Sequence, residues 1–185
     1  MTRFGLKCID GKRLRLRLVR PEDAAYIRFL RMDTRYNAHL SAVSGTIEDQ
    51  RAWIEDYKLR EAAGTEYYYI IENRLNGRPC GVVRLYDLQD DQFTWGSWIL
   101  DENKPKLAAL ESAILSFGVG FEMLGYKRLV LDVRKRNERA LAFYRRIGAS
   151  EIVEDDLNFY FQYTSDRFFA DRQNHLELLN KVEPL

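Results

Sequence analysis

An amide and a phenol stand seven residues apart in the segment from Leu129 to Ala149. Asn137 follows a short apolar strand and a polar turn, and Tyr144 lies two turns along the helix that Asn137 is expected to cap. A phenol with a pKa of about 10 can protonate a leaving thiolate whose conjugate acid has a pKa of about 8.5, because the mismatch costs only about 2 kcal/mol. This pair therefore indicates a site that holds a thioester and protonates the thiolate as it leaves.

Both side chains also have an ordinary structural role. Tyr144 shares a helix face with Leu141 and Ile147, where an aromatic ring would pack against the core. The Asn137 side chain would accept a hydrogen bond from a backbone N–H in the first turn of the helix, as N-cap residues do. The amide can serve as both cap and binding group, whereas packing and proton donation are alternatives for the phenol.

Strands and helices must alternate along the chain to position these residues. Alternating leucines and arginines predict a first strand at 14–18, and Pro21 suits the first turn of the helix that follows. The buried side of that helix is expected to carry Tyr26, Ile27, Leu30 and Met32. A loop is expected over 37–45. Further strands are predicted at 66–73, 79–88, 92–100, 129–133, 151–153 and 158–163, and further helices at 47–63, 105–124, 138–147 and 166–180.

This order predicts an α/β (α+β) fold with a mixed central sheet of about seven strands flanked by helices. The strands between 66 and 100 form an antiparallel meander with turns at Asn76-Gly77 and Asp90-Asp91. The helix at 105–124 then crosses over to a later strand. We expect a single domain over 1–185, with a core at 14–163 and a helical tail at 164–185.

Composition narrows the classes of function. Apolar residues make up 46% and aromatic residues 13% of the 185 residues, which favours a packed core. A net charge of +1 gives no reason to expect nucleic acid or an anionic membrane as a partner. Cys8, Cys80, His39 and His175 are isolated, which argues against structural zinc. No signal peptide or membrane span is predicted, so we expect a cytoplasmic protein.

The predicted order, together with the segment that carries the amide and the phenol, resembles the GNAT superfamily of acyl-CoA-dependent N-acyltransferases. The most specific part of the resemblance is a strand end of the form Leu-x-Val followed, at the family's spacing, by Asn137, Ala140, Tyr144 and Gly148. The opening RLRLVRPEDA and the helix that begins at Thr46 are similar to members that acetylate protein N-termini or small amines. The resemblance covers 14–163 and implies acetyl-CoA as the acyl donor.

The resemblance also implies where acetyl-CoA binds. In the family, the fourth strand and the strand after the long helix splay apart, and the pantetheine arm hydrogen-bonds to the fourth strand, here Trp98, Ile99 and Leu100. The pyrophosphate lies on the N-terminus of the long helix, where free N–H groups and the helix dipole attract anions. That segment here contains Lys104, Lys106, Leu107, Ala108 and Ala109. It lacks the glycines of the family motif R/Q-x-x-G-x-G/A, although alanine is nearly as small and the lysines supply charge.

The resemblance assigns candidates to the chemistry. The family uses a tyrosine at the position of Tyr144 to protonate the leaving thiolate, and its asparagine seven residues earlier also contacts the cofactor. In some members an acidic residue just before the valine of Leu-x-Val is the general base, and Asp132 stands there. The alternative for Asp132 is an ion pair with Arg134, Arg136 or a neighbouring strand. His39, in the loop that lines the acceptor pocket of this fold, is the alternative base.

The acceptor must be a neutral amine when it attacks, because an ammonium group has no lone pair. We expect a small primary amine such as a nucleotide-linked amino sugar. This expectation rests on a likeness to biosynthetic members with a similar helix start and not on residue chemistry. A protein N-terminus is the alternative acceptor, and a non-catalytic acyl-CoA-binding or interaction module is the alternative class. Trp95 and Ser97 lie on the strand that flanks the acceptor, where Trp95 either stacks on a ring or belongs to the core. A monomer or homodimer is expected.

Overall fold

The computed structural model describes residues 3–38 and 44–181, and one mixed sheet forms its centre. Within those residues the sheet has eight strands in the order β1-β2-β3-β4-β5-β6-β8-β7, and neighbouring strands are antiparallel except β5 and β6. The strands are β1 (Cys8–Asp10), β2 (Leu14–Leu18), β3 (Tyr67–Asn73), β4 (Arg78–Gln89), β5 (Gln92–Leu100), β6 (Arg128–Arg134), β7 (Ser150–Glu154) and β8 (Asn158–Thr164). The mixed sheet with its meander is confirmed. The strand that the sequence did not predict is β1, which is too short to show an alternating pattern.

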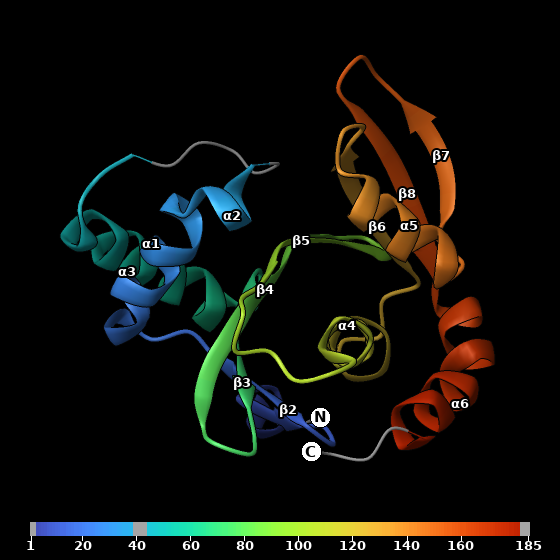
Figure 1. Cartoon of the computed structure of the whole chain (residues 1–185), viewed down its shortest axis with the longest axis horizontal. Helices are drawn as coiled ribbons and strands as arrows, with labels where there is room; N and C mark the ends of the chain where they lie inside the picture. The colour runs from blue at the N-terminus through green and yellow to red at the C-terminus, as the bar shows by residue number, and fades with distance from the viewer. Residues whose placement is uncertain (1–2, 39–43, 182–185) are drawn as a thin grey trace.

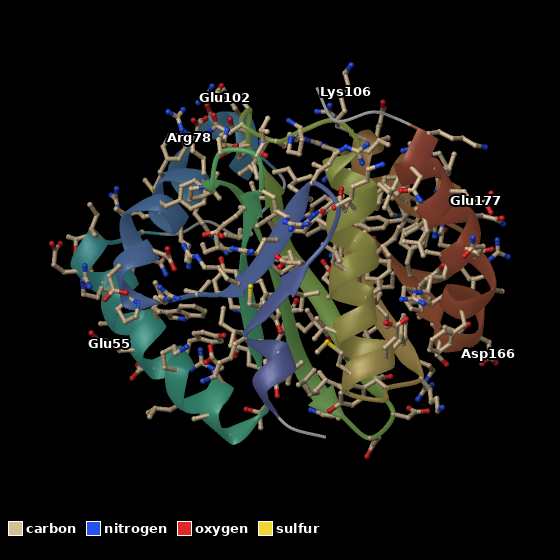
Figure 2. The ribbon with its side chains drawn as sticks, turned by 90° about the horizontal axis from the view of Figure 1, so that it is seen from below. Glu55, Arg78, Glu102, Lys106, Asp166 and Glu177 are labelled. Atoms are coloured by element: carbon tan, nitrogen blue, oxygen red, sulfur yellow. The ribbon has the colours of Figure 1, made fainter. Side chains whose placement is uncertain are left out.

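Helices cover both faces of this sheet (Figures 1 and 2). The helical segments are η1 (Arg3–Leu6), η2 (Pro21–Asp23), α1 (Ala24–Met32), α2 (Thr34–Asn37), α3 (Ile47–Ala63), α4 (Ala108–Gly118), η3 (Val119–Met123), α5 (Glu138–Arg146) and α6 (Ser165–Lys181). Helices α1 and α3 pack on one face, whereas α4, α5 and α6 pack on the other. Among the helices of the described residues, none has the length and apolar character needed to cross a membrane.

The two ends of α3 follow local sequence signals. Thr46 Oγ1 accepts a hydrogen bond from the Asp49 N–H at 3.1 Å, and the Asp49 carboxylate accepts one from the Thr46 N–H at 2.7 Å, which forms a capping box. Gly64 closes the helix in the left-handed conformation, with a φ of 78°. The fixed helix holds Trp53 against the sheet, where its ring meets Tyr68 of β3 edge-on at 6.0 Å.

Helix α4 begins later than the sequence indicated, at Ala108 and not near Pro105. The residue before it, Leu107, is the N-cap and has a φ of 62°, which costs a leucine about 1 kcal/mol. Pro105 lies in the turn ahead of the helix, where its carbonyl accepts a hydrogen bond from the Ala108 N–H at 3.3 Å. The turn therefore takes a backbone shape that usually selects glycine, although it contains none.

The C-terminal end of α4 widens into the π-helical turn η3. This turn lies against Phe93 of β5, and a methyl group added at Gly120 would overlap the Phe93 ring. Phe93 also meets Phe121 at a ring separation of 5.3 Å. The helix can approach β5 this closely because residue 120 has no side chain.

Strands β5 and β6 pair over a short seam and then separate. Residues 92–94 of β5 pair with 128–130 of β6, while β6 pairs with β8 along its whole length. From Trp95 to Leu100, the edge of β5 that faces β6 has no strand partner in the described part of the chain. The predicted splay between the fourth and fifth strands is therefore confirmed, as the splay between β5 and β6.

A β-bulge distorts β5 just beyond this seam. The pairing with β4 shifts by one residue between Gly96 and Ile99, and Ser97 in the bulge has a φ of 48°. The bulge changes which face each side chain reaches. Trp98 packs toward α4, whereas Ile99 packs with the cluster under α1 and α3.

One local prediction near the first helix is wrong. Met32 is 44% exposed and not on the buried side, because α1 ends at Met32 and the chain turns at Asp33. The sequence did not predict α2 at 34–37, whose Arg35 N–H donates to the Asp33 carboxylate at 2.9 Å and whose last residue is the first of the predicted loop at 37–45. Residues 39–43 of that loop lie outside the described residues.

Candidate active site

A cavity of about 210 Å³ lies where β5 and β6 separate. Its lining combines Tyr86 of β4, Ser97 and Trp98 of β5, Asp132 of β6, and Asn137 and Tyr144 of α5. Five of these six residues were candidates from the sequence, namely Ser97, Trp98, Asp132, Asn137 and Tyr144, and Tyr86 was not. The splay and the start of α5 therefore bring the predicted amide, phenol and carboxylate to one place.

Tyr144 reaches this cavity from the second turn of α5 and is only 5% exposed. Its ring meets Trp95 edge-on at 5.9 Å and lies 6.2 Å from the ring of Trp98. Burial raises the pKa of Tyr144, and the negative charge of Asp132 raises it further. The hydroxyl is therefore protonated at neutral pH. Packing and proton donation are compatible here, since the ring belongs to the core and the residue borders the cavity.

Asn137 caps α5 and borders the cavity at the same time. Its side-chain oxygen accepts a hydrogen bond from the Ala140 N–H at 3.2 Å, so the predicted cap is confirmed. The side-chain nitrogen is not needed for that cap and keeps its donor capacity, in a residue that borders the cavity.

Asp132 is an exposed residue on the face of β6 opposite to Leu131 and Val133. Within the described residues, no ion pair joins its carboxylate to Arg134, Arg136 or another basic side chain. The structural alternative of an ion-paired carboxylate therefore has no support, and the side chain borders the same cavity as the phenol of α5. The alternative base, His39, lies outside the described residues.

The residues expected to hold the pantetheine arm lie along the open edge of β5. Trp98 borders the cavity, and its indole N–H donates to Ser112 Oγ of α4 at 3.1 Å. Ile99 is buried under α1 and α3, and Leu100 packs toward α4. Because β6 has turned away, this edge offers backbone hydrogen-bonding groups to an extended chain that carries amides.

The first turn of α4 offers further donors. No residue of the described part of the chain accepts a hydrogen bond from the backbone N–H of Ala109 or Leu110. Lys104 Nζ donates to the Asp101 carbonyl at 2.9 Å. Lys106 is exposed and projects away from the ribbon beside this end of α4 (Figure 2). Free N–H groups and nearby lysines fit an anionic diphosphate, even without the glycines of the family motif.

A larger cavity, of about 300 Å³, lies between α1, the start of α3 and the sheet. Three arginines line it, Arg28 and Arg31 of α1 and Arg84 of β4. Trp53 of α3 forms part of the same wall. Arg31 and Ser97 border both cavities, so the two are adjacent compartments that meet at the β5 bulge.

The wall of the larger cavity is positively charged. Arg84 lies over the ring of Tyr86, with its guanidinium carbon 4.2 Å from the ring centroid, and its Nε is 3.5 Å from the Glu66 carboxylate. Arg28 Nε donates to the Gly45 carbonyl at 2.9 Å, which leaves its two terminal nitrogens for other partners. The acidic residue in this wall, Asp49, is engaged in the capping box of α3.

Trp95 and Ser97 lie on β5, the strand that was expected to flank the acceptor. Trp95 is 2% exposed and its indole N–H donates to Ser116 Oγ at 2.8 Å, so it belongs to the core, and it also borders the cavity between β5 and β6. Ser97, in contrast, borders both cavities.

Neither the basic side chains of the larger cavity nor Tyr86 were candidates from the sequence. Arg28 and Arg31 stand three residues apart and therefore on one face of α1, which is a readable signal. Arg84 is a single charge inside the apolar run CGVVRLY, and such a residue in a buried strand indicates a specific role. Nothing in the sequence marks Tyr86 apart from the other tyrosines.

Comparisons with known proteins agree with this geometry. Residues 13–150 match the family model described as an acetyltransferase (GNAT) domain. No curated protein sequence matches the chain significantly. Among solved structures, apo FdhC, described as a nucleotide-linked sugar GNAT, is 38% identical with a TM-score of 0.85, and the match covers 95% of this chain and 98% of that chain.

Two further solved structures share the fold at low identity. The ribosomal-protein-S5-alanine acetyltransferase from Vibrio fischeri is 15% identical with a TM-score of 0.75, covering 86% of this chain and 97% of that one. The spermidine N-acetyltransferase from Vibrio cholerae, solved with CoA and spermine, is 16% identical with a TM-score of 0.75, covering 86% and 99%. By its family match and its 38% identity to a GNAT enzyme, the chain belongs to the GNAT acetyltransferase family and is an acetyl-CoA-dependent N-acetyltransferase.

Proposed function

We propose that this enzyme transfers the acetyl group of acetyl-CoA to the primary amine of a nucleotide-linked amino sugar, and that 1–185 form a single N-acyltransferase domain. The observation that carries the proposal is the charge of the larger cavity. Its three arginines, Arg28, Arg31 and Arg84, face the compartment that adjoins the gap between β5 and β6. The 38% identity to a nucleotide-linked sugar GNAT supports the same acceptor class.

The positive charge of the larger cavity favours one of the candidate acceptors over the other two. A nucleoside diphosphate carries negative charges that arginine binds well, often through two parallel hydrogen bonds. A polyamine such as spermidine carries several positive charges and would be repelled by the same wall. A peptide N-terminus brings no diphosphate for these three half-buried guanidinium groups to bind. The half-buried ring of Trp53 adds a flat apolar surface for a base or a sugar.

Within this proposal the chain's residues have distinct tasks. The amine nitrogen attacks the thioester carbonyl carbon, the carbon–sulfur bond breaks, and Tyr144 gives its hydroxyl proton to the departing sulfur. Asp132 accepts the proton that the bound ammonium must lose before it attacks, because ammonium pKa values of about 8 to 10 leave most of the amine charged at pH 7. Backbone N–H groups along the open edge of β5 stabilise the developing oxyanion. Acetyl-CoA supplies the activated acyl group.

A panel of acceptors tests the proposal directly. The wild-type protein is mixed with acetyl-CoA and, separately, with nucleoside-diphosphate-linked amino sugars, spermidine and a peptide with a free N-terminal alanine, and release of free thiol is followed. We expect one of the amino sugars to be acetylated with a kcat/KM at least about 100-fold above that of the peptide and the polyamine, since about 3 kcal/mol comes from charge-assisted contacts. Faster turnover of the peptide or of spermidine would refute the proposal.

Removing one arginine should weaken acceptor binding selectively. We expect Arg28→Gln to raise KM for the nucleotide-linked amino sugar about 10-fold with little change in kcat, because a charge-assisted hydrogen bond to phosphate contributes about 1.5 kcal/mol. The KM for the free amino sugar without its nucleotide should not change. Arg51→Gln, an exposed arginine of α3 outside this cavity, is the matched control. An equal effect of Arg28→Gln on both forms of the sugar would contradict the placement of the diphosphate.

A further inference from the structure

Tyr86 stands where the two cavities meet, on the side from which the acceptor arrives. Along β4, Val83 and Leu85 belong to the core cluster under α4, so Arg84 and Tyr86 face the side of α1 and α3. Tyr86 borders the cavity between β5 and β6 together with Asp132. Tyr144 reaches the same cavity from α5, on the opposite face of the sheet. Two phenols thus border one cavity from its two sides.

Two neighbours fix the position of the Tyr86 ring. The guanidinium carbon of Arg84 lies 4.2 Å from the ring centroid, a distance at which a cation and an aromatic face attract each other. A methyl group added at Gly96 would lie 3.0 Å from the Tyr86 hydroxyl oxygen. The hydroxyl therefore lies over the backbone of β5, next to Ser97, which borders both cavities. A side chain at position 96 would displace it.

The charged groups around this phenol come from several elements. They are Arg31 of α1, Glu66 before β3, Arg84 and Asp87 of β4, and Asp132 and Arg134 of β6. Burial is the largest effect and raises the pKa of Tyr86, Arg84 lowers it, and Asp132 raises it. Tyr86 is therefore protonated at neutral pH, so it can accept a proton only by passing on its own.

We propose that Tyr86 is a further catalytic residue, which relays a proton from the acceptor ammonium to Asp132. One N–H proton of the bound ammonium passes to the Tyr86 hydroxyl oxygen while the hydroxyl proton of Tyr86 passes to the Asp132 carboxylate and then to solvent. The transfer to Asp132 is direct or through one water molecule, for which a cavity of about 210 Å³ has room. The neutral amine then attacks, and Tyr144 protonates the leaving sulfur.

Geometry favours a relay over direct transfer to the carboxylate. In the proposed function the acceptor occupies the larger cavity, which meets the gap at Ser97, and the Tyr86 hydroxyl lies beside that junction. Asp132 stands on β6, on the far side of the gap. The relay rests on this part of the proposed function, the placement of the acceptor in the larger cavity, and it applies to any amine that binds there.

The test is the pH dependence of Tyr86→Phe, measured with the member of the acceptor panel that the wild-type protein acetylates fastest. We expect kcat to fall about 30-fold at pH 6.5, as for loss of a general base, and KM for acetyl-CoA to stay within about twofold. The loss should shrink to less than about threefold at pH 9, because the amine then arrives neutral and needs no relay. A purely structural role would give the same loss at every pH.

Two more variants make the test decisive. Tyr160→Phe is the matched control, since Tyr160 pairs with Asp132 across β6 and β8 but donates its hydroxyl to Asp155 at 2.7 Å. We expect it to leave the pH profile unchanged. Gly96→Ala keeps the Tyr86 hydroxyl but displaces it, and we expect a smaller loss of kcat with the same pH trend. This variant also tests the relay if Tyr86→Phe folds poorly. No loss in Tyr86→Phe, or a loss that is constant from pH 6.5 to 9, would overturn the relay.

Discussion

Replacing Tyr144 with phenylalanine is expected to lower kcat about 100-fold while KM for acetyl-CoA changes less than about threefold. The variant keeps the ring that packs between Trp95 and Trp98 and removes only the proton donor at the cavity. General acids of this kind contribute about 100-fold or more to the rate. Steady-state kinetics with varied acetyl-CoA, together with a thermal shift on donor binding, separate turnover from affinity.

The control for this variant is a second buried tyrosine of the same core cluster. Tyr163 is 2% exposed, and its hydroxyl has no hydrogen-bond partner in the described part of the chain. We expect Tyr163→Phe to leave kcat unchanged and to stabilise the fold by about 1 kcal/mol, since it removes a buried unsatisfied hydroxyl. If Tyr144→Phe kept its turnover within about threefold of wild type, the sulfur would have to be protonated from elsewhere.

The second large effect concerns stability at the end of α4. We expect Gly120→Ala to destabilise the fold by about 3 kcal/mol, because the added methyl group would overlap the Phe93 ring and force η3 away from β5. Chemical denaturation measures this change as a lower midpoint with an unchanged slope.

A neighbouring glycine offers a matched control for that change. Gly118 lies in the same helix, and a methyl group there would come no closer than 3.5 Å to the Glu122 carboxylate. Gly118→Ala should therefore be neutral or stabilising by up to about 1 kcal/mol, as alanine favours helix. Equal effects of the two substitutions would show that helix propensity, and not contact with Phe93, determines stability here.

The elements of the fold with local signals could be predicted from the sequence. Asn137 and Gly148 mark the two ends of α5, and Thr46 with Asp49 marks the start of α3. These signals work because the interactions that they announce lie within a few residues along the chain. The gap between β5 and β6 was expected from the resemblance to a family. The pattern of apolar residues indicates where strands lie, but it does not indicate at which residue two neighbouring strands stop pairing.

The acceptor side of the site could not be predicted in the same way. Arg28 and Arg31 come from α1 and Arg84 from β4, and they converge only because β3 and β4 pack under α1 and α3. The function of Tyr86 depends on its contact with Gly96, which exists only after β4 and β5 have paired with a bulge. Such long-range contacts leave no periodic trace in the chain.

The turn before α4 has the backbone conformation that is typical of glycine, although its sequence lacks the glycines of the family motif. The residues there lack the glycines of the family, yet Leu107 adopts the left-handed conformation that glycine adopts most easily. The N–H groups of Ala109 and Leu110 remain available to an anion beyond that turn. The side chain of Leu107 is partly buried against the core on the α4 side of the sheet, a contact that glycine could not make.

The short seam between β5 and β6 also has a mechanical consequence. Past 92–94 and 128–130 no ladder hydrogen bond crosses from one strand to the other, so moving them apart there breaks none. The two parts of the sheet both rest on α4, which lies between them in Figure 1. Widening the gap beyond the seam therefore costs side-chain packing but no strand-ladder hydrogen bond.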